Sequence, residues 1–227
     1  MSPMKNPRII GTIAVIILLG LTPLAFAQEN YTMRVITVGM CAAIAVYGLN
    51  IILGFTGQLN LAQGGFFGIG AYGVGLLTTD YDWSFWAAFV ASVIGTAVIG
   101  YLCGLLALRT KDEYFAIFTM AIGFIIFLVI SRWESVTHAH SGVNNVKFPE
   151  GGGLIDFESP VAMFYLVFAI LLVCIYTTYA IRRSSVGRTL LSIRTSEDLA
   201  DAIGVRVGFS KQLAFAASAV LGGIGGG

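Results

Sequence analysis

Apolar side chains gather into six long runs along the chain, with short polar stretches between them. The runs cover residues 9–27, 35–53, 61–78, 84–108, 114–130 and 160–181. Each approaches or exceeds the roughly 17 to 25 residues that a helix needs to cross the hydrocarbon of a bilayer. Strand-like alternation is not evident. The pattern therefore predicts an all-α, polytopic transmembrane helical bundle rather than a β-barrel.

The two ends of the chain carry predictions of their own. A seventh apolar run opens at Gln212 and is cut off at Gly227, so we expect the sequence to be a C-terminally truncated fragment of a longer protein. The first run follows Lys5 and Arg8 and ends in small residues at 25–27, which also fits a cleaved secretory signal peptide. We favour an uncleaved span, because the run is long for a signal core and another span follows at once.

Composition and charge agree with a membrane protein. Hydrophobic residues make up 57% of the chain and charged residues 11%, whereas soluble domains carry about 25% charged residues. No acid or base falls inside the six runs. This excludes a water-soluble enzyme, a nucleic-acid binder and a disordered tail. Cys41, Cys103 and Cys174 each lie in an apolar run, so we interpret them as packing side chains rather than a disulfide framework.

The distribution of basic residues predicts the orientation. Cytoplasmic segments of membrane proteins carry an excess of lysine and arginine. With a cytoplasmic N-terminus, the inner segments hold ten of these residues and the outer segments three, namely Arg34, Arg132 and Lys147. Residues 182–211 then form a cytoplasmic loop.

The segment 54–65 combines glycines and carboxamides at membrane depth without a charge. Irregular backbone is tolerated there only where protein or a water-lined cavity satisfies its polar groups. A helix break of this kind is typical of a translocation path. The alternative is a plain turn whose amides stabilise its own backbone. The candidate pathway residues are Asn50, Thr56, Gln58, Asn60 and Gln63.

Two motif matches carry little weight. Residues 68–73 spell G-x-G-x-x-G, but no preceding strand makes this a dinucleotide fingerprint. We interpret the small residues as a site of close helix approach. His138 and His140 with Glu134 are a candidate metal site that lacks evident third and fourth ligands, so no metal and no cofactor is predicted.

The chain lacks the groups that would power transport or catalysis. No Ser-His-Asp or Cys-His pattern and no phosphate-binding G-x-x-x-x-G-K-[ST] motif is discernible, so no catalytic residue is predicted. Ion-coupled carriers commonly place ionisable residues inside their spans, and these runs hold none. We expect a transporter, not an enzyme, whose energy comes from another protein.

Two short amphipathic helices are predicted in the loop 182–211. Val186, Leu190 and Ile193 share one helical face. Ser196 is placed to cap a second helix that Gly204 ends. This pair is either a docking element for a partner or a hairpin lying on lipid headgroups.

Several motifs together resemble a known family. Residues 48–61 and 65–72 closely resemble the signature of branched-chain amino acid ABC-importer permeases of the LivM type. The resemblance resumes at 114–117 and is strongest across 187–215. The sequence departs from the family at Phe124, where many members carry a carboxylate, and at 138–140, where many carry a Gly-rich turn.

The resemblance implies a permease subunit, spanning 1–227, in a bacterial inner membrane. It implies a second similar permease, two cytoplasmic ATPases and an external solute-binding protein as partners. It also implies that the loop couples to the ATPases through Gly187, Arg188, Arg194, Glu197, Ala200 and Gly204. The alternatives are a related permease for urea, amides or other amino acids, and a self-sufficient channel or secondary carrier.

Overall fold

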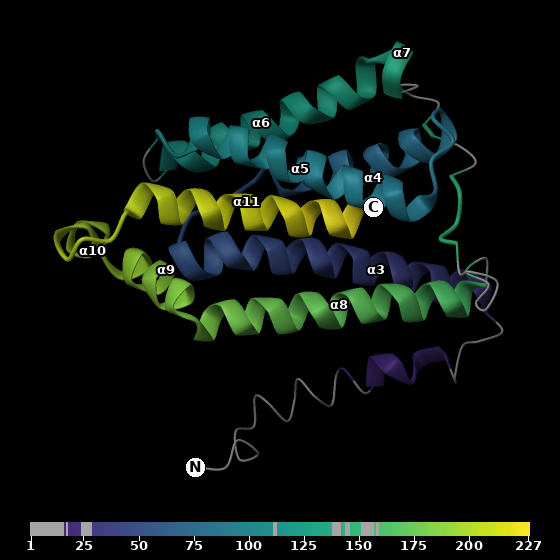
Figure 1. Cartoon of the computed structure of the whole chain (residues 1–227), viewed down its shortest axis with the longest axis horizontal. Helices are drawn as coiled ribbons and strands as arrows, with labels where there is room; N and C mark the ends of the chain where they lie inside the picture. The colour runs from purple at the N-terminus through teal and green to yellow at the C-terminus, as the bar shows by residue number, and fades with distance from the viewer. Residues whose placement is uncertain are drawn as a thin grey trace.

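The computed structural model describes residues 16, 18–23, 29–110, 113–137, 142–143, 146–150, 157 and 159–227. Within these residues the regular structure is entirely helical (Figure 1). Five helical segments are long and apolar enough to cross a membrane, which confirms the predicted polytopic bundle. Most of the predicted first run lies outside the described residues.

The helices follow the predicted runs closely. The long ones are α3 (Asn30–Leu49) with the π-helical turn η2 (Asn50–Gly54), α4 (Gln63–Thr79), α5 (Phe85–Ala107), α6 (Glu113–Arg132), α8 (Pro160–Arg183) and α11 (Val207–Gly226). The short ones are α7 (Glu134–Thr137), α9 (Ser185–Thr195) and α10 (Glu197–Ala202). At 17 residues, α4 reaches only about 25 Å. It is therefore shorter than the five segments long enough to span a bilayer of about 30 Å.

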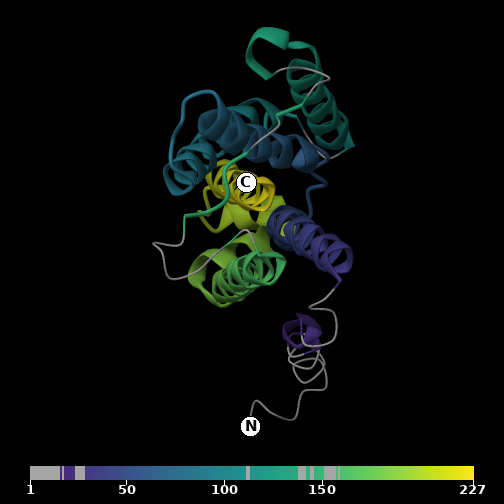
Figure 2. The same ribbon diagram turned by 90° about the vertical axis from the view of Figure 1, so that its right-hand side faces the viewer.

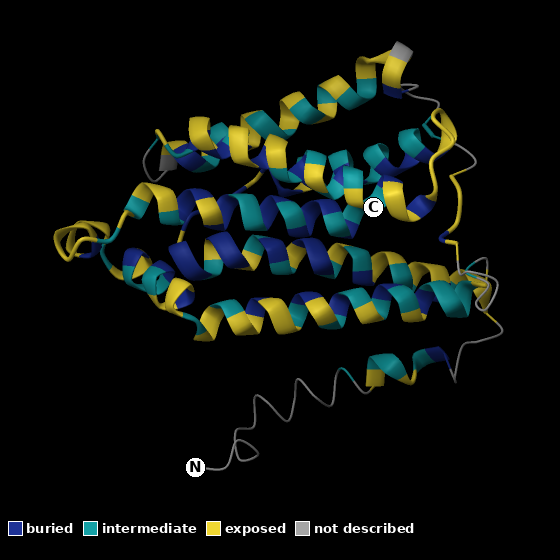
Figure 3. Ribbon diagram, viewed as in Figure 1, coloured by how far each residue is buried: buried dark blue, intermediate teal, exposed yellow. Residues whose placement is uncertain are grey.

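Helix α11 is the centre of the bundle. It packs against α3, α4 and α5, while α8 covers α3 and α6 covers α4 (Figures 1 and 2). Half of the most apolar window of α11 is buried, against 11% for α6 (Figure 3). The seventh run is thus the core of the described fold, and α6 is its most peripheral long helix.

The bundle has two distinct ends. The α9–α10 hairpin (residues 185–202) lies at one end, together with the end of α8, the start of α11 and the break between η2 and α4 (Figure 1). We call this the hairpin end. The α4–α5 turn and the start of α8 lie at the opposite, far end (Figure 1).

Glycines allow the central helices to approach closely. A Cβ at Gly70 of α4 would meet the backbone of Gly223 in α11, and a Cβ at Gly73 would meet Ser92 of α5. The Ser92 hydroxyl donates a hydrogen bond of 2.9 Å to the Gly70 carbonyl. The interpretation of residues 68–73 as a helix-packing motif is therefore confirmed.

Helix α11 begins at Val207, five residues before the apolar run that predicted it. The extra turn ends with Lys211, which Gln212 follows at the start of the predicted run, and both side chains are buried. Lys211 pairs with Glu197, and Gln212 donates a hydrogen bond of 2.5 Å to the Tyr101 carbonyl. Because these partners satisfy the polar groups, the helix continues where hydropathy alone places a loop.

At the far end, a strap of residues 146–150 lies over the α4–α5 turn. Lys147 Nζ contacts Asp82 Oδ1 at 2.5 Å, and Trp86 Nε1 donates a hydrogen bond of 3.0 Å to the Glu150 carbonyl. The Lys147 hydrogen bond and charge hold the pKa of the Asp82 carboxyl below its ordinary value of 3.8.

This ion pair makes the strap sensitive to acid. The pKa of Asp82 is lower in the folded protein than in the unfolded chain. The stability that the ion pair contributes is therefore fully present above about pH 4, and it is lost as the pH falls through the lowered pKa. The effect is small, since the Asp82 side chain is 88% exposed.

We expect the hydrogen-exchange protection factors of 146–150 to decrease at low pH in the native protein. In Asp82→Asn, protection should be lower at neutral pH and insensitive to acid. An identical pH dependence in both proteins would contradict the prediction.

Candidate coupling surface and helix break

The second apolar run ends in a break, as predicted. The π-helical turn η2 ends at Gly54, and the six residues 57–62 are not helical. Gly57 has a φ of +80°, which an L side chain rarely adopts, and its amide donates a 3.1 Å hydrogen bond to the Leu53 carbonyl. The chain then re-enters the bundle at Gln63, the first residue of α4.

The Gln63 carboxamide joins three helices. Its Nε2 donates hydrogen bonds to the Ala45 carbonyl of α3 at 2.9 Å and to the Ser218 carbonyl of α11 at 3.1 Å. Its Oε1 accepts from the Ser218 hydroxyl at 3.0 Å and from Asn60 Nδ2 at 3.4 Å. The side chain is 8% exposed. In this conformation the protein itself satisfies both atoms of the amide.

Asn60 holds the other side of the break. Its side chain is buried, and its Oδ1 accepts a 2.9 Å hydrogen bond from the Ala62 amide. The neighbouring Leu61 amide donates to the Thr119 hydroxyl of α6 at 3.1 Å. The bond from the Ala62 amide to Asn60 matches the alternative of a turn whose amides stabilise its own backbone, whereas Gln63 bonds to the backbone of α3 and α11.

The remaining candidate pathway residues lie apart from this pair. Asn50 is exposed on η2, with its side chain over Gly54 of the same turn. Thr56 is buried and donates a 2.6 Å hydrogen bond to the Ile52 carbonyl. Gln58 is nine-tenths buried, and its Oε1 has no hydrogen-bond partner among the described residues. Gln58 is thus the buried pathway candidate whose amide oxygen can still accept a hydrogen bond.

Helices α9 and α10 form the predicted hairpin, with the predicted cap at Ser196 and an additional cap at Ser184. The Ser184 hydroxyl accepts from the Gly187 amide, and the Ser196 hydroxyl accepts from the Leu199 amide, both at 3.3 Å. Gly204 has a φ of +86° just after α10, which confirms it as the stop. Asp198 lies in the first turn of α10, where its negative charge interacts favourably with the helix dipole.

The apolar side chains of the hairpin differ in their burial. Leu190 and Ile193 of α9 are buried against the bundle, but Val186, predicted on the same face, is 44% exposed. On α10 the buried residue is Ala200, while Leu199 and Ile203 are 65% and 71% exposed. The second half of the hairpin is mostly exposed (Figure 3), and its exposed side chains include the apolar Leu199 and Ile203.

Some of the candidate coupling residues shape the α8–α9 corner, and others contact more distant parts of the bundle. Gly187 is buried at the α8–α9 corner, where a Cβ would meet the backbone of Ile181 and Arg182. Arg188 is exposed and donates to the Arg183 carbonyl at 3.1 Å. Arg194 and Glu197 are also exposed, but each contacts another part of the bundle: Arg194 Nη1 donates to the Gly54 carbonyl at 2.6 Å, and Glu197 pairs with Lys211.

A cleft of about 1020 Å³ separates the hairpin from the break. Residues 56–59 form one wall, and residues 193–198 form another. Arg109 and Lys211 add positive charge, and Glu197 and Asp198 add negative charge. The cleft is accordingly polar and carries charges of both signs.

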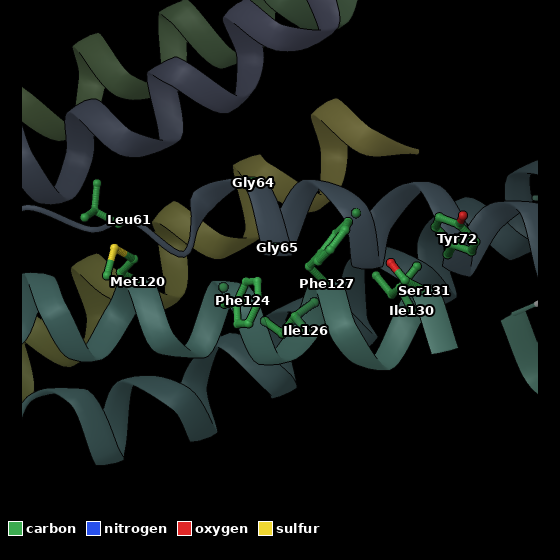
Figure 4. Close-up of a pocket in the computed structure, with 12 residues that line it drawn as sticks. Leu61, Gly64, Gly65, Tyr72, Met120, Phe124, Ile126, Phe127, Ile130 and Ser131 are labelled. Carbon is green, nitrogen blue, oxygen red and sulfur yellow. The ribbon is translucent and has the colours of Figure 1, made fainter. Parts of the chain in front are cut away.

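A second concavity, of about 480 Å³, lies between α4 and α6 (Figure 4). Bare backbone at Gly64, Gly65 and Gly68 forms its floor, and Phe124 and Phe127 line the opposite side. Phe124 is 59% exposed here. This groove is therefore apolar rather than acidic.

Sequence reasoning missed three polar anchors. Gln212, Ser218 and Thr119 lie in or beside apolar runs and were not singled out, yet each forms a hydrogen bond between elements. The available signal was a polar side chain inside an apolar run, which needs a buried partner. His138 and His140, the candidate metal ligands, lie outside the described residues.

Known proteins match most of this chain. A sequence model of the family described as "Branched-chain amino acid transport system / permease component" matches residues 31–227. The chain is 29% identical over 223 residues to the High-affinity branched-chain amino acid transport system permease protein LivM of Escherichia coli strain K12. It is 28% identical over 223 residues to the protein of the same name in Salmonella typhimurium strain LT2.

Both alignments cover 88% of this chain and 52% of the relative, so the chain spans about half the length of these curated relatives. No solved structure matches the chain at a significant level. The family match extends over α3 to α11, including the break and the hairpin. The chain therefore belongs to the permease component family of branched-chain amino acid transport systems.

Proposed function

We propose that this chain is the membrane permease of an ATP-binding-cassette importer that moves branched-chain amino acids across the bacterial inner membrane. The family and its two LivM relatives support the transport role. The observation that carries the coupling role is the α9–α10 hairpin, which presents Leu199 and Ile203 to an outside partner. On this proposal the hairpin end is cytoplasmic and two ATPase subunits supply the energy.

A second permease and an external solute-binding protein complete the proposed assembly. The charge pattern supports an external energy source, because the described residues of the six predicted apolar runs include no acid or base. Solute affinity is assigned mainly to the binding protein, so that Gln58 needs to offer only a weak polar contact. Thr56 shares the cleft wall with Gln58 and is proposed to line the same route. A pathway role for Asn50, Asn60 and Gln63 stays a prediction.

The coupling role predicts that charge on the exposed apolar face of α10 prevents ATPase binding. In the full-length permease, Leu199→Asp with Ile203→Asp should reduce ATPase co-purification about tenfold or more. Loss of a hot-spot residue near the centre of an interface costs about 2 kcal/mol or more, which is more than a tenfold change in affinity. Both side chains are exposed, so the bundle should keep its thermal stability.

The matched control is Tyr31→Asp, an equally exposed side chain at the far end of the bundle. It should leave ATPase co-purification unchanged. Normal ATPase recovery with the α10 double variant would contradict the coupling role. Leucine flux through the purified chain alone, in liposomes without ATP, would instead favour a channel or secondary carrier.

A further inference from the structure

We infer that Arg194 is a positioning residue for transport, which relays movement of the α9–α10 hairpin to the helix break beside Gln58. This inference rests on the proposed importer function. It differs from a direct role in ATPase binding, because the exposed Arg194 side chain donates a hydrogen bond to the Gly54 carbonyl beside the break. It assigns the docking task to α10 and the transmission task to the end of α9.

The first observation is the hydrogen bond of 2.6 Å from Arg194 Nη1 to the Gly54 carbonyl, between residues 140 positions apart in sequence. Carbonyls near a helix end lack partners within the helix, and η2 ends at Gly54. The guanidinium therefore caps the end of the second apolar run. Hydrogen bonds from charged donors are about twice as strong as neutral ones.

The second observation is the path of the Arg194 side chain. A Cβ at Gly57 would lie 3.3 Å from Arg194 Cγ, so the aliphatic part of the arginine passes directly over Gly57. Gly57 has a positive φ and immediately precedes Gln58. The same arginine thus contacts both sides of the point where the helix breaks.

The third observation is that α9 is seated firmly on the bundle. Leu190 and Ile193 are 2% and 1% exposed, and Leu190 belongs to the same buried cluster as Phe55 and Ala214. A rigid helix with a buried face moves as a unit rather than bending locally. Displacement of α9 is therefore transmitted to Gly54 through Arg194 and to Phe55 through the core.

Movement of α9 would change the shape of the mixed-charge cleft. Residues 56–59 form one wall of the cleft and residues 193–198 another, so a shift of α9 changes the width between them. Gln58, with its unpartnered Oε1, lies in the wall that follows Gly57. Movement of the hairpin is thereby linked to the exposure of a polar group on the proposed route.

Arg188 provides the comparison within the same helix. It is exposed, and it donates a hydrogen bond to the Arg183 carbonyl at the end of α8. Removal of its charge changes the hairpin surface without removing a bond to the break. Comparison of variants at the two arginines therefore distinguishes an effect on the hairpin surface from an effect on the break.

The test uses the full-length permease assembled with its partners in proteoliposomes supplied with binding protein and radiolabelled leucine. Arg194→Met keeps the side-chain length and removes the donor. We expect leucine transported per ATP to fall at least about fivefold, the lower end of typical coupling between linked sites. ATPase co-purification should be unchanged, and Arg194→Lys should restore part of the ratio.

Hydrogen exchange of the amides in 55–62 supplies a readout that does not depend on transport. Exchange should accelerate in Arg194→Met and remain at the native rate in Arg188→Met. Native exchange in Arg194→Met, or an unchanged ratio of leucine to ATP, would overturn the relay. A parallel loss of uptake and ATPase binding would overturn it too. If the native complex itself neither hydrolyses ATP nor takes up leucine, the importer proposal fails, and the relay fails with it.

Discussion

Gly70→Ala is expected to lower the stability of the bundle sharply, although it adds a single methyl group. The new Cβ would lie 2.8 Å from the Gly223 Cα and 2.9 Å from its carbonyl carbon, with the carbonyl oxygen closer still. All three atoms belong to the backbone of α11, so no side chain can rotate away. Helices α4 and α11 must separate, and overpacking of this kind costs about 1–3 kcal/mol or more.

The cost is concentrated at the centre of the fold. Gly223 also lies against Thr96 of α5, so displacement of α11 disturbs a second contact on its other side. Thermal unfolding of the purified protein in detergent, followed by circular dichroism, measures the loss. A reduced yield of monodisperse protein on size exclusion should accompany it.

Gly64→Ala is the matched control on the same helix. No heavy atom lies within 4 Å of a Cβ built at Gly64. Alanine is favoured over glycine in a helix by about 1 kcal/mol, so this variant should be as stable as the native protein or slightly more stable. Equal unfolding temperatures for the two variants would show that α4 and α11 are not in close contact at Gly70.

Gln63→Leu is expected to destabilise the junction of α3, α4 and α11. Leucine has a similar size, but it removes the acceptor of the buried Ser218 hydroxyl and the donor to the Ala45 carbonyl. A buried polar group left without a partner costs roughly 1–3 kcal/mol. Unfolding temperature and hydrogen exchange across α4 should both report the change.

Gln58→Leu is the control in the same segment. Because Gln58 Oε1 has no partner among the described residues, the same substitution should leave the stability unchanged. A double variant sharpens the test: adding Ser218→Ala to Gln63→Leu removes both partners of one bond and should restore part of the stability. Equal stability of Gln63→Leu and the native protein would contradict the junction role.

The two glutamine variants also distinguish a packing role from a pathway role. If Gln58 lines the route, Gln58→Leu lowers uptake in a protein that is fully assembled. If Gln63 acts mainly by joining the three helices, the uptake defect of Gln63→Leu reflects the loss of folded protein. The defect then disappears when uptake is normalised to the amount of folded protein.

The chain order of the helices was predictable because hydrophobic length is a local property. Runs such as 84–108 and 160–181 correspond to α5 and α8 within a few residues. The caps at Ser196 and Gly204 were predictable for the same reason, since each depends on backbone groups a few residues away. Which side chains of a short helix are buried was not predictable: Val186 was placed on one face with Leu190 and Ile193, yet it is exposed while they are buried.

By itself, the sequence determined that this chain is a helical membrane protein with a break after its second apolar run and a capped hairpin after residue 183. The tertiary structure decided what those features contact: Gln63 meets Ser218, and Arg194 meets Gly54. Each pair is separated by 140 residues or more. Hydropathy and spacing describe each residue relative to its neighbours in sequence, whereas these contacts exist only after the helices have packed.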